Sequence, residues 1–134
     1  MKKKLLVTLC ACGLLGVNAF AAVTSTVSGS TTFNERTFSY NMNFNPTIIA
    51  ATSVYYDTRY EHNVFSYIGA TEALISDPDV TNYKTTSQSQ YFDEGDPIAG
   101  VTAACSTSAG YAFTTATSTH VLVQGSAVVR TLHY

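Results

Sequence analysis

The sequence predicts an all-β protein, either an antiparallel β-sandwich or a small barrel, with at most one short helix. Residues 37–44 alternate between apolar and polar side chains, and the apolar ones are Phe38, Tyr40, Met42 and Phe44. A period of two is typical of a half-buried antiparallel strand. Similar short runs follow at regular intervals between turn signals, which is the pattern of stacked antiparallel sheets.

Strand signals continue along the chain, where β-branched and aromatic residues are enriched in further runs. The expected strands are residues 47–56, 63–68, 98–104 and 111–116, and a C-terminal hairpin in which 121–123 and 127–129 flank Gln124-Gly125-Ser126. The only helix candidate is Ala70–Ser76, which Asp77-Pro78 would stop.

The segment from Asp77 to Pro97 differs from the rest. It combines Pro78, two acidic clusters and the polar run 85–90. We expect it to form either a long loop or a pair of exposed edge strands. Loops of this kind carry function more often than cores do.

The first 21 residues have the layout of a bacterial secretory signal peptide. Lys2–Lys4 give a positive start, Leu5–Val17 is an apolar run, and Ala19–Ala21 is a small-x-small cleavage signal. The apolar run is shorter than the roughly 20 residues that cross a bilayer, so no transmembrane segment is expected after cleavage. The predicted product is one secreted β domain, residues 22–134, in the periplasm or outside the cell.

Removal of this leader would change the charge. The three leader lysines are lost from seven bases, so the mature net charge is 4 − 9 = −5. An acidic chain with four scattered bases has no stripe of positive charge for phosphates, which makes nucleic acid an unsuitable partner. Anionic membrane surfaces are disfavoured for the same reason.

Cys105 is the one cysteine beyond the leader, so no internal disulfide can form in the mature chain. It could act as a nucleophile or form a bridge between molecules. The alternative is a small buried apolar residue between Ala103-Ala104 and Ser106.

Reactive side chains are densest between Tyr55 and His62. If this segment were a strand, Asp57, Arg59 and Glu61 would share one face and His62 would lie on the other. A hydrolase could use the two carboxylates with His62 as proton carrier, and a metal ion could be bound by Asp57, Glu61 and His62. The alternative is a strand end where Arg59 pairs with two carboxylates.

A second group of carboxylates could bind calcium, which prefers oxygen ligands from flexible loops. These weak candidates are Asp77, Asp79, Asp93, Glu94 and Asp96. They lack the spacing of an EF-hand, and a solvated acidic turn is the alternative. No cofactor is expected, because the sequence has no glycine-rich phosphate loop, paired-cysteine motif or catalytic histidine motif.

The segment that would begin the mature chain, Ala22–Phe33, alternates as an extended strand, with Val23, Val27, Gly29 and Phe33 on one face. It resembles the N-terminal donor segment of chaperone–usher fimbrial subunits, and the final strand with Tyr134 is loosely similar to the C-terminal strand of that family. The resemblance implies an immunoglobulin-like sandwich that a neighbouring subunit completes by strand addition.

These observations favour an exported bacterial protein without enzymatic activity, which assembles or adheres at the cell surface through protein partners. Under this hypothesis a charged residue at Val27 abolishes assembly and spares the folded domain. A first alternative is a soluble periplasmic or secreted binding module that uses the acidic loop 77–97. A second is a small secreted hydrolase or metal-binding protein.

Overall fold

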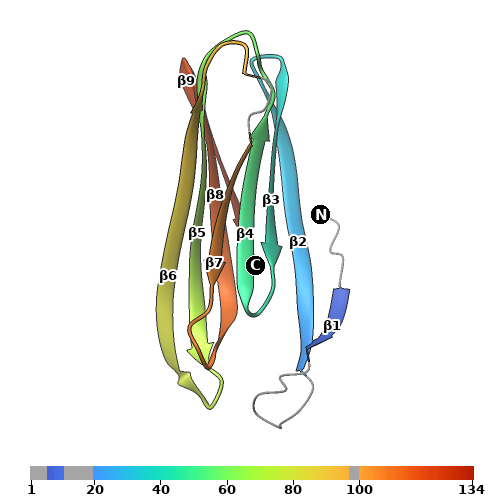
Figure 1. Cartoon of the computed structure of the whole chain (residues 1–134), viewed down its shortest axis with the longest axis vertical. Helices are drawn as coiled ribbons and strands as arrows, with labels where there is room; N and C mark the ends of the chain where they lie inside the picture. The colour runs from blue at the N-terminus through green and yellow to red at the C-terminus, as the bar shows by residue number, and fades with distance from the viewer. Residues whose placement is uncertain (1–5, 11–19, 97–99) are drawn as a thin grey trace.

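The computed structural model describes residues 6–10, 20–96 and 100–134, with side chains from residue 24 onward. Two antiparallel sheets pack face to face, which confirms the predicted β-sandwich (Figure 1). The first sheet has the order β1 (Leu6–Cys10), β2 (Phe20–Phe33), β3 (Arg36–Phe44), β4 (Ile48–Tyr55) and β7 (Gly100–Ser106). The second has the order β6 (Asp77–Phe92), β5 (His62–Leu74), β8 (Tyr111–Gln124) and β9 (Ser126–His133).

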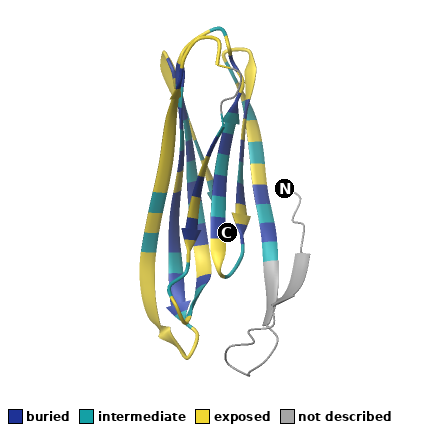
Figure 2. Ribbon diagram, in the orientation of Figure 1, coloured by how far each residue is buried: buried dark blue, intermediate teal, exposed yellow. Residues whose placement is uncertain are grey.

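The core lies between the inward faces of the two sheets, as the buried positions in Figure 2 show. The predicted alternation in β3 is confirmed, because Phe38, Tyr40, Met42 and Phe44 are all buried. At the end of the chain Tyr134 stacks on Phe44, with ring centroids 3.8 Å apart. This contact anchors the C-terminus to the opposite sheet.

Tight turns connect the hairpins. The β8–β9 hairpin is confirmed, and Gly125 makes its turn with a φ of 70°. The turn between β2 and β3 has positive φ at both Asn34 (46°) and Glu35 (66°). Positive φ at both central residues is the geometry of a type I′ turn, which matches the twist of two paired strands. This second hairpin joins the N-terminal segment to β3 of its own sheet.

The predicted helix Ala70–Ser76 is wrong, because residues 70–74 belong to β5 and no helix occurs in the described part of the chain. Strand β5 lies between β6 and β8 and pairs with both. The even-numbered residues of β5 are buried from His62 to Glu72, and the register shift opposite Thr71/Glu72 leaves Thr114 of β8 as the unpaired residue. Ala70, Glu72, Ala73 and Leu74 favour a helix locally, and pairing on both sides of the strand overrides this preference.

The expectation for residues 77–97 is corrected as well. Residues 77–92 form one continuous edge strand, β6, rather than a loop or two strands. Its polar side chains resemble a loop in the sequence because they are exposed on both sides of the strand (Figure 2). Only residues 93–96 remain as a described turn.

The predicted leader falls mostly outside the described residues. Strand β1 pairs with Phe20–Thr24, and the expected cleavage point after Ala21 lies within β2. Cleavage and export therefore stay predictions. Among the described residues, no helix is long and apolar enough to span a membrane.

Candidate functional site

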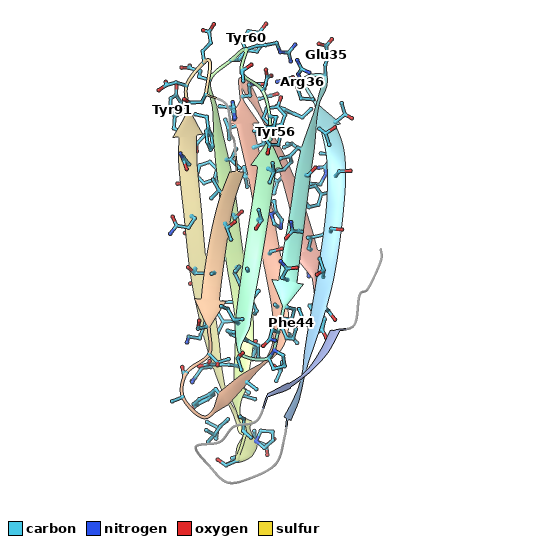
Figure 3. All side chains as sticks on the ribbon, turned by 45° about the vertical axis from the view of Figure 1, so that its right-hand side comes forward. Glu35, Arg36, Phe44, Tyr56, Tyr60 and Tyr91 are labelled. Carbon is cyan, nitrogen blue, oxygen red and sulfur yellow. The ribbon has the colours of Figure 1, made fainter. Side chains whose placement is uncertain are left out.

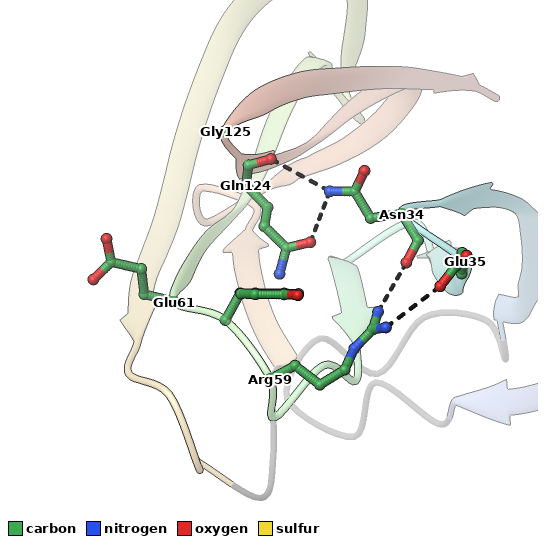
Figure 4. A pocket seen from close by; sticks show the side chains of 7 residues that line it. Asn34, Glu35, Arg59, Glu61, Gln124 and Gly125 are labelled. Carbon is green, nitrogen blue, oxygen red and sulfur yellow. Dashed lines mark hydrogen bonds and ion pairs between the residues drawn. The ribbon is translucent and has the colours of Figure 1, made fainter.

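One end of the sandwich, which we call the apical end, gathers three connections between strands. These are the turn at Asn34-Glu35, the loop 56–61 and the turn at Gly125, and they surround an open cavity of about 590 Å³ (Figure 4). The cavity is lined by Asn34, Glu35, Arg59, Tyr60, Glu61, Gln124 and Gly125. Figure 3 shows Glu35, Arg36, Tyr60 and Tyr91 at this end, with Phe44 near the other.

Asp57 fixes the shape of the 56–61 loop. Its buried carboxylate accepts hydrogen bonds from Arg59 Nε at 2.9 Å, from Arg59 Nη2 at 3.1 Å and from the Arg59 backbone N–H at 3.0 Å. These bonds hold the pKa of Asp57 well below its usual range, although burial opposes them. Arg59 also bonds the Asn34 carbonyl and lies 3.4 Å from the carboxylate of Glu35. Arg59 therefore links the 56–61 loop to the turn at Asn34-Glu35.

The buried hydroxyl of Tyr55 and the amide of Gln124 connect the third turn to this network. Tyr55 Oη lies 3.0 Å from Gln124 Oε1 and 3.1 Å from the carbonyl of Phe33. Gln124 Nε2 donates to Asp57 at 3.2 Å, and Asn34 Nδ2 donates to Gln124 Oε1 at 2.8 Å. Burial, together with the negative charge of Asp57, raises the pKa of Tyr55 to about 12. The apical loops are thus held in one arrangement.

The structure does not bring Asp57, Glu61 and His62 together as a catalytic or metal-binding group. Residues 56–61 form a loop rather than a strand, so the predicted sharing of faces is wrong. Asp57 is engaged by Arg59, while exposed Glu61 accepts a hydrogen bond from Tyr91. The hydrogen bond with Glu61 and burial raise the pKa of Tyr91 to about 12. Arg59 does pair with two carboxylates, but the second is Glu35 and not Glu61.

His62 points into the sandwich at the start of β5. Its ring stacks on Phe92 and meets Tyr55 edge-on, at centroid distances of 5.3 and 5.2 Å. Nδ1 donates to the carbonyl of Tyr60 at 3.0 Å, whereas buried Nε2 has no partner. The ring therefore packs within the core and does not face the cavity carboxylates as a proton carrier.

The five candidate calcium ligands lie at opposite ends of β6. Asp77 and Asp79 are at its start, and Asp93, Glu94 and Asp96 follow its end. A strand of 16 residues spans roughly 50 Å, so the two groups cannot share an ion. In the turn, Asp96 accepts the backbone N–H of Asp93 at 2.9 Å. No group of three metal-ligating side chains converges in the described part of the chain.

Sequence reasoning missed a polar network in the centre of the core. The His120 ring lies between Ser53 and Ser118, with Nδ1 and Nε2 each 2.8 Å from a serine hydroxyl. Burial lowers the pKa of His120 to about 4. The inward position of His120 could have been found from the alternation with Ser118 and Leu122, but its contact with Ser53 depends on how the two sheets face each other.

Besides Asp57, a second buried carboxylate, that of Glu72, lies towards the end of the sandwich opposite the apical end. Its carboxylate accepts hydrogen bonds from the Ser108 backbone N–H at 2.8 Å and from Ser108 Oγ at 2.6 Å, and Lys84 Nζ lies 3.8 Å away. Burial acts to raise the pKa of Glu72, but the bonds from Ser108 outweigh it and the pKa is lowered. Glu72 thereby fastens the β7–β8 connection to β5.

The predicted assembly strand lies inside the chain's own sandwich. β2 pairs with β3 from Ser25 to Phe33, and Val27 is only 2% exposed. Gly29 lies under the ring of Tyr40, and Phe33 packs against the core, while the side chain of Val23 is outside the described residues. Because Val27 is a core residue, a charge there would unfold the domain, and the expectation that it spares the fold is wrong.

Among the edge strands whose side chains the structure describes, β6 is the most exposed. It pairs with β5 along one side, and in the described part of the chain no strand pairs with its other side. All of its residues except Lys84, Thr86 and Phe92 are exposed. A free edge of this kind presents unpaired backbone N–H and C=O groups to any strand that can align with it.

Cys105 is buried on the inward face of β7, in agreement with its interpretation as a small apolar residue. Burial raises the pKa of its thiol. A buried thiol with a raised pKa is a poor nucleophile.

The chain matches no protein-family model, no curated protein and no solved structure. Arguments about its function therefore rest on its own residues.

Proposed function

We propose that this chain is an exported bacterial β-sandwich that works by assembly or adhesion at the cell surface, without enzymatic activity. The observation that carries the proposal is the free edge of β6. Backbone groups along such an edge supply affinity for an added strand, and the side chains on either side of it supply register.

The sequence of β6 supports this proposal, because the residues that prevent strand addition are confined to one half of the strand. In natural proteins, charged residues and proline on an edge strand prevent another strand from pairing with it. In β6 these are Asp77, Pro78, Asp79 and Lys84, all in its first half. The second half, Thr85–Phe92, holds threonine, serine, glutamine and two aromatic residues. This half is therefore open to pairing.

The outer face of the first sheet is uncharged, which is compatible with assembly. The outward positions of four of its strands carry only serine, threonine, asparagine and small or aliphatic residues. These positions lie within residues 26–32 of β2, 37–43 of β3, 48–54 of β4 and 100–106 of β7. In a chain of mature net charge −5, a face without charges is one on which two copies do not repel each other.

The donor-strand mechanism suggested by the fimbrial resemblance needs an additional step. β2 would have to leave β3 and withdraw Val27 from the core before it could complete a neighbour. β6 needs no such step, because none of the described strands pairs with its outer edge. We therefore favour β6 over β2 as the assembling edge.

The proposal is tested by the solution mass of residues 22–134, measured by size-exclusion chromatography with light scattering over a wide range of concentrations. Assembly predicts species heavier than one chain that increase with concentration. A single-chain mass at every concentration, together with no binding to cells or host surfaces, contradicts the proposal.

A second candidate is a binding module, and the apical cavity favours it. The Asp57–Arg59 network fixes the loop that carries Tyr56 and Tyr60, each 58% exposed. Exposed tyrosines on a fixed loop are typical of ligand-binding surfaces. Replacement of Tyr60 by alanine should then abolish binding to a screened ligand panel and leave the solution mass unchanged.

A further inference from the structure

We infer that the strand which pairs with β6 is β6 of a second copy, aligned antiparallel about a twofold axis through Ser89. This inference rests on the proposed function and names its partner. An antiparallel pair with a twofold axis is isologous, so a single edge has to be complementary to itself. The question is whether the side chains of β6 meet this condition.

The geometry restricts the possible registers. A twofold axis that relates two antiparallel edge strands stands perpendicular to the sheet, so both copies keep their inward faces on the same side. Directly opposite residues also share a face. With Ser89 on the axis, residues equally far before and after Ser89 lie opposite each other in the two copies.

This register pairs compatible chemical groups. Gln88 lies opposite Gln90 of the second copy, so that two pairs of amides can exchange hydrogen bonds. On the outer face Ser87 lies opposite Tyr91 of the second copy. No two like charges lie opposite each other in the paired segment.

The glutamine pairs distinguish this alignment from the neighbouring one. If the axis passed through Gln88 instead, Gln90 would fall opposite Thr86, and only Gln88 would face a glutamine. Charges do not set the register, because Lys84 donates within its own chain to the carbonyl of Ser106 at 2.7 Å and lies 3.8 Å from the carboxylate of Glu72.

There is also room for the second copy. The inward side chains Gln88 and Gln90 are exposed, so the shorter strand β7 leaves these two side chains uncovered. An added strand can therefore continue the second sheet from four strands to eight across the axis. The dimer closes both β6 edges.

The test compares Ser89→Cys with Ser87→Cys in the 22–134 chain, each oxidised with glutathione disulfide. Both serines are exposed on the outer face of β6, and native Cys105 is buried. In the first variant the introduced thiols sit on the axis with their Cα atoms about 5 Å apart, within disulfide range, whereas in the second the corresponding Cα atoms lie about 14 Å apart. Ser89→Cys should form a covalent dimer at least tenfold faster than Ser87→Cys.

Ser89→Lys provides a second readout, since it places two lysines opposite each other on the axis. We expect it to keep the fold, because Ser89 is exposed, and to shift the light-scattering mass from two chains to one. Ser89→Thr is the matched control and should stay dimeric.

Equal cross-linking of the two cysteine variants, a ladder of higher multiples, or a Ser89→Lys variant that still dimerises would each overturn the inference. If the mass still rises with concentration in these cases, the proposed function stands and another edge carries it. A chain that is monomeric at every concentration and binds no surface contradicts both the inference and the proposed function.

Discussion

Asp57 and Arg59 lie two residues apart in one loop, yet they bind each other and organise the whole apical end. The Asp57 carboxylate is fully buried while the Arg59 side chain is 36% exposed, so the partly hydrated guanidinium neutralises a charge that the core could not hold alone. Through this pair the loop 56–61 is fastened to the turn at Asn34.

We predict that Arg59→Met destabilises the domain far more than Arg36→Met. The first change leaves the buried carboxylate of Asp57 without its cation, whereas Arg36 is exposed. Urea unfolding followed by tyrosine fluorescence measures the difference. Equal midpoints for the two variants would show that the Asp57–Arg59 pair is not structural.

Stability should fall as the pH drops from about 6.5 to about 4. His120 is neutral in the folded core with a pKa near 4, while the unfolded chain binds a proton at the ordinary value of 6.5. Its contribution is complete above pH 6.5 and is lost as the pH approaches 4, an effect of about 3 kcal/mol for a shift of this size.

The pH effect has a matched control. His120→Gln should remove most of this dependence, whereas exposed His133→Gln should retain it, as measured by urea midpoints between pH 4 and 7. Asp57 adds a separate loss at lower pH, because its folded pKa lies below the ordinary value of 3.8. An unchanged pH profile in His120→Gln would contradict the assignment.

Gly29→Ala should be destabilising and Gly100→Ala should be tolerated. A Cβ at Gly29 would lie 2.6 Å from Cε2 of buried Tyr40, whereas the nearest atom at Gly100 is 3.7 Å away. Overpacking of this kind costs about 1–3 kcal/mol. Thermal unfolding of the two variants gives the comparison, and a harmless Gly29→Ala would mean that the Tyr40 ring moves freely.

Cys105 should react with iodoacetamide only when the domain opens. Its thiol is buried and its pKa is raised by burial, so native protein offers little thiolate. Mass spectrometry should show slow labelling in buffer and rapid labelling in urea. Fast labelling of the folded chain would indicate an accessible, reactive thiol.

Sequence patterns predict most of the fold because much of the chain alternates strictly. β3 and the β8–β9 hairpin can be located from the order of apolar residues and from Gly125. β5 is partly misassigned from sequence, because residues 70–74 are rich in helix formers and only pairing with β6 and β8 makes them a strand. β6 resembles a loop in the sequence, because an edge strand that is exposed on both faces needs no alternating apolar residues.

The candidate sites are less predictable. Asp57 and Arg59 are close in sequence, and their pairing is among the alternatives that the local pattern allows. The partners Gln124 and Asn34 come from distant hairpins, so no local pattern contains them. The network of His120 with Ser53 likewise depends on how two sheets face each other, since 67 positions separate the two residues.

The central claim, that β6 is an edge built for pairing, is tested most directly by amide hydrogen exchange of residues 22–134 at low and high protein concentration. We predict that the amides between Thr85 and Phe92 that are not hydrogen-bonded to β5 exchange rapidly when dilute and become protected when concentrated, while Ser126–His133 of β9 does not change. Exchange in β6 that is independent of concentration, or new protection found in β9 instead, would contradict the account.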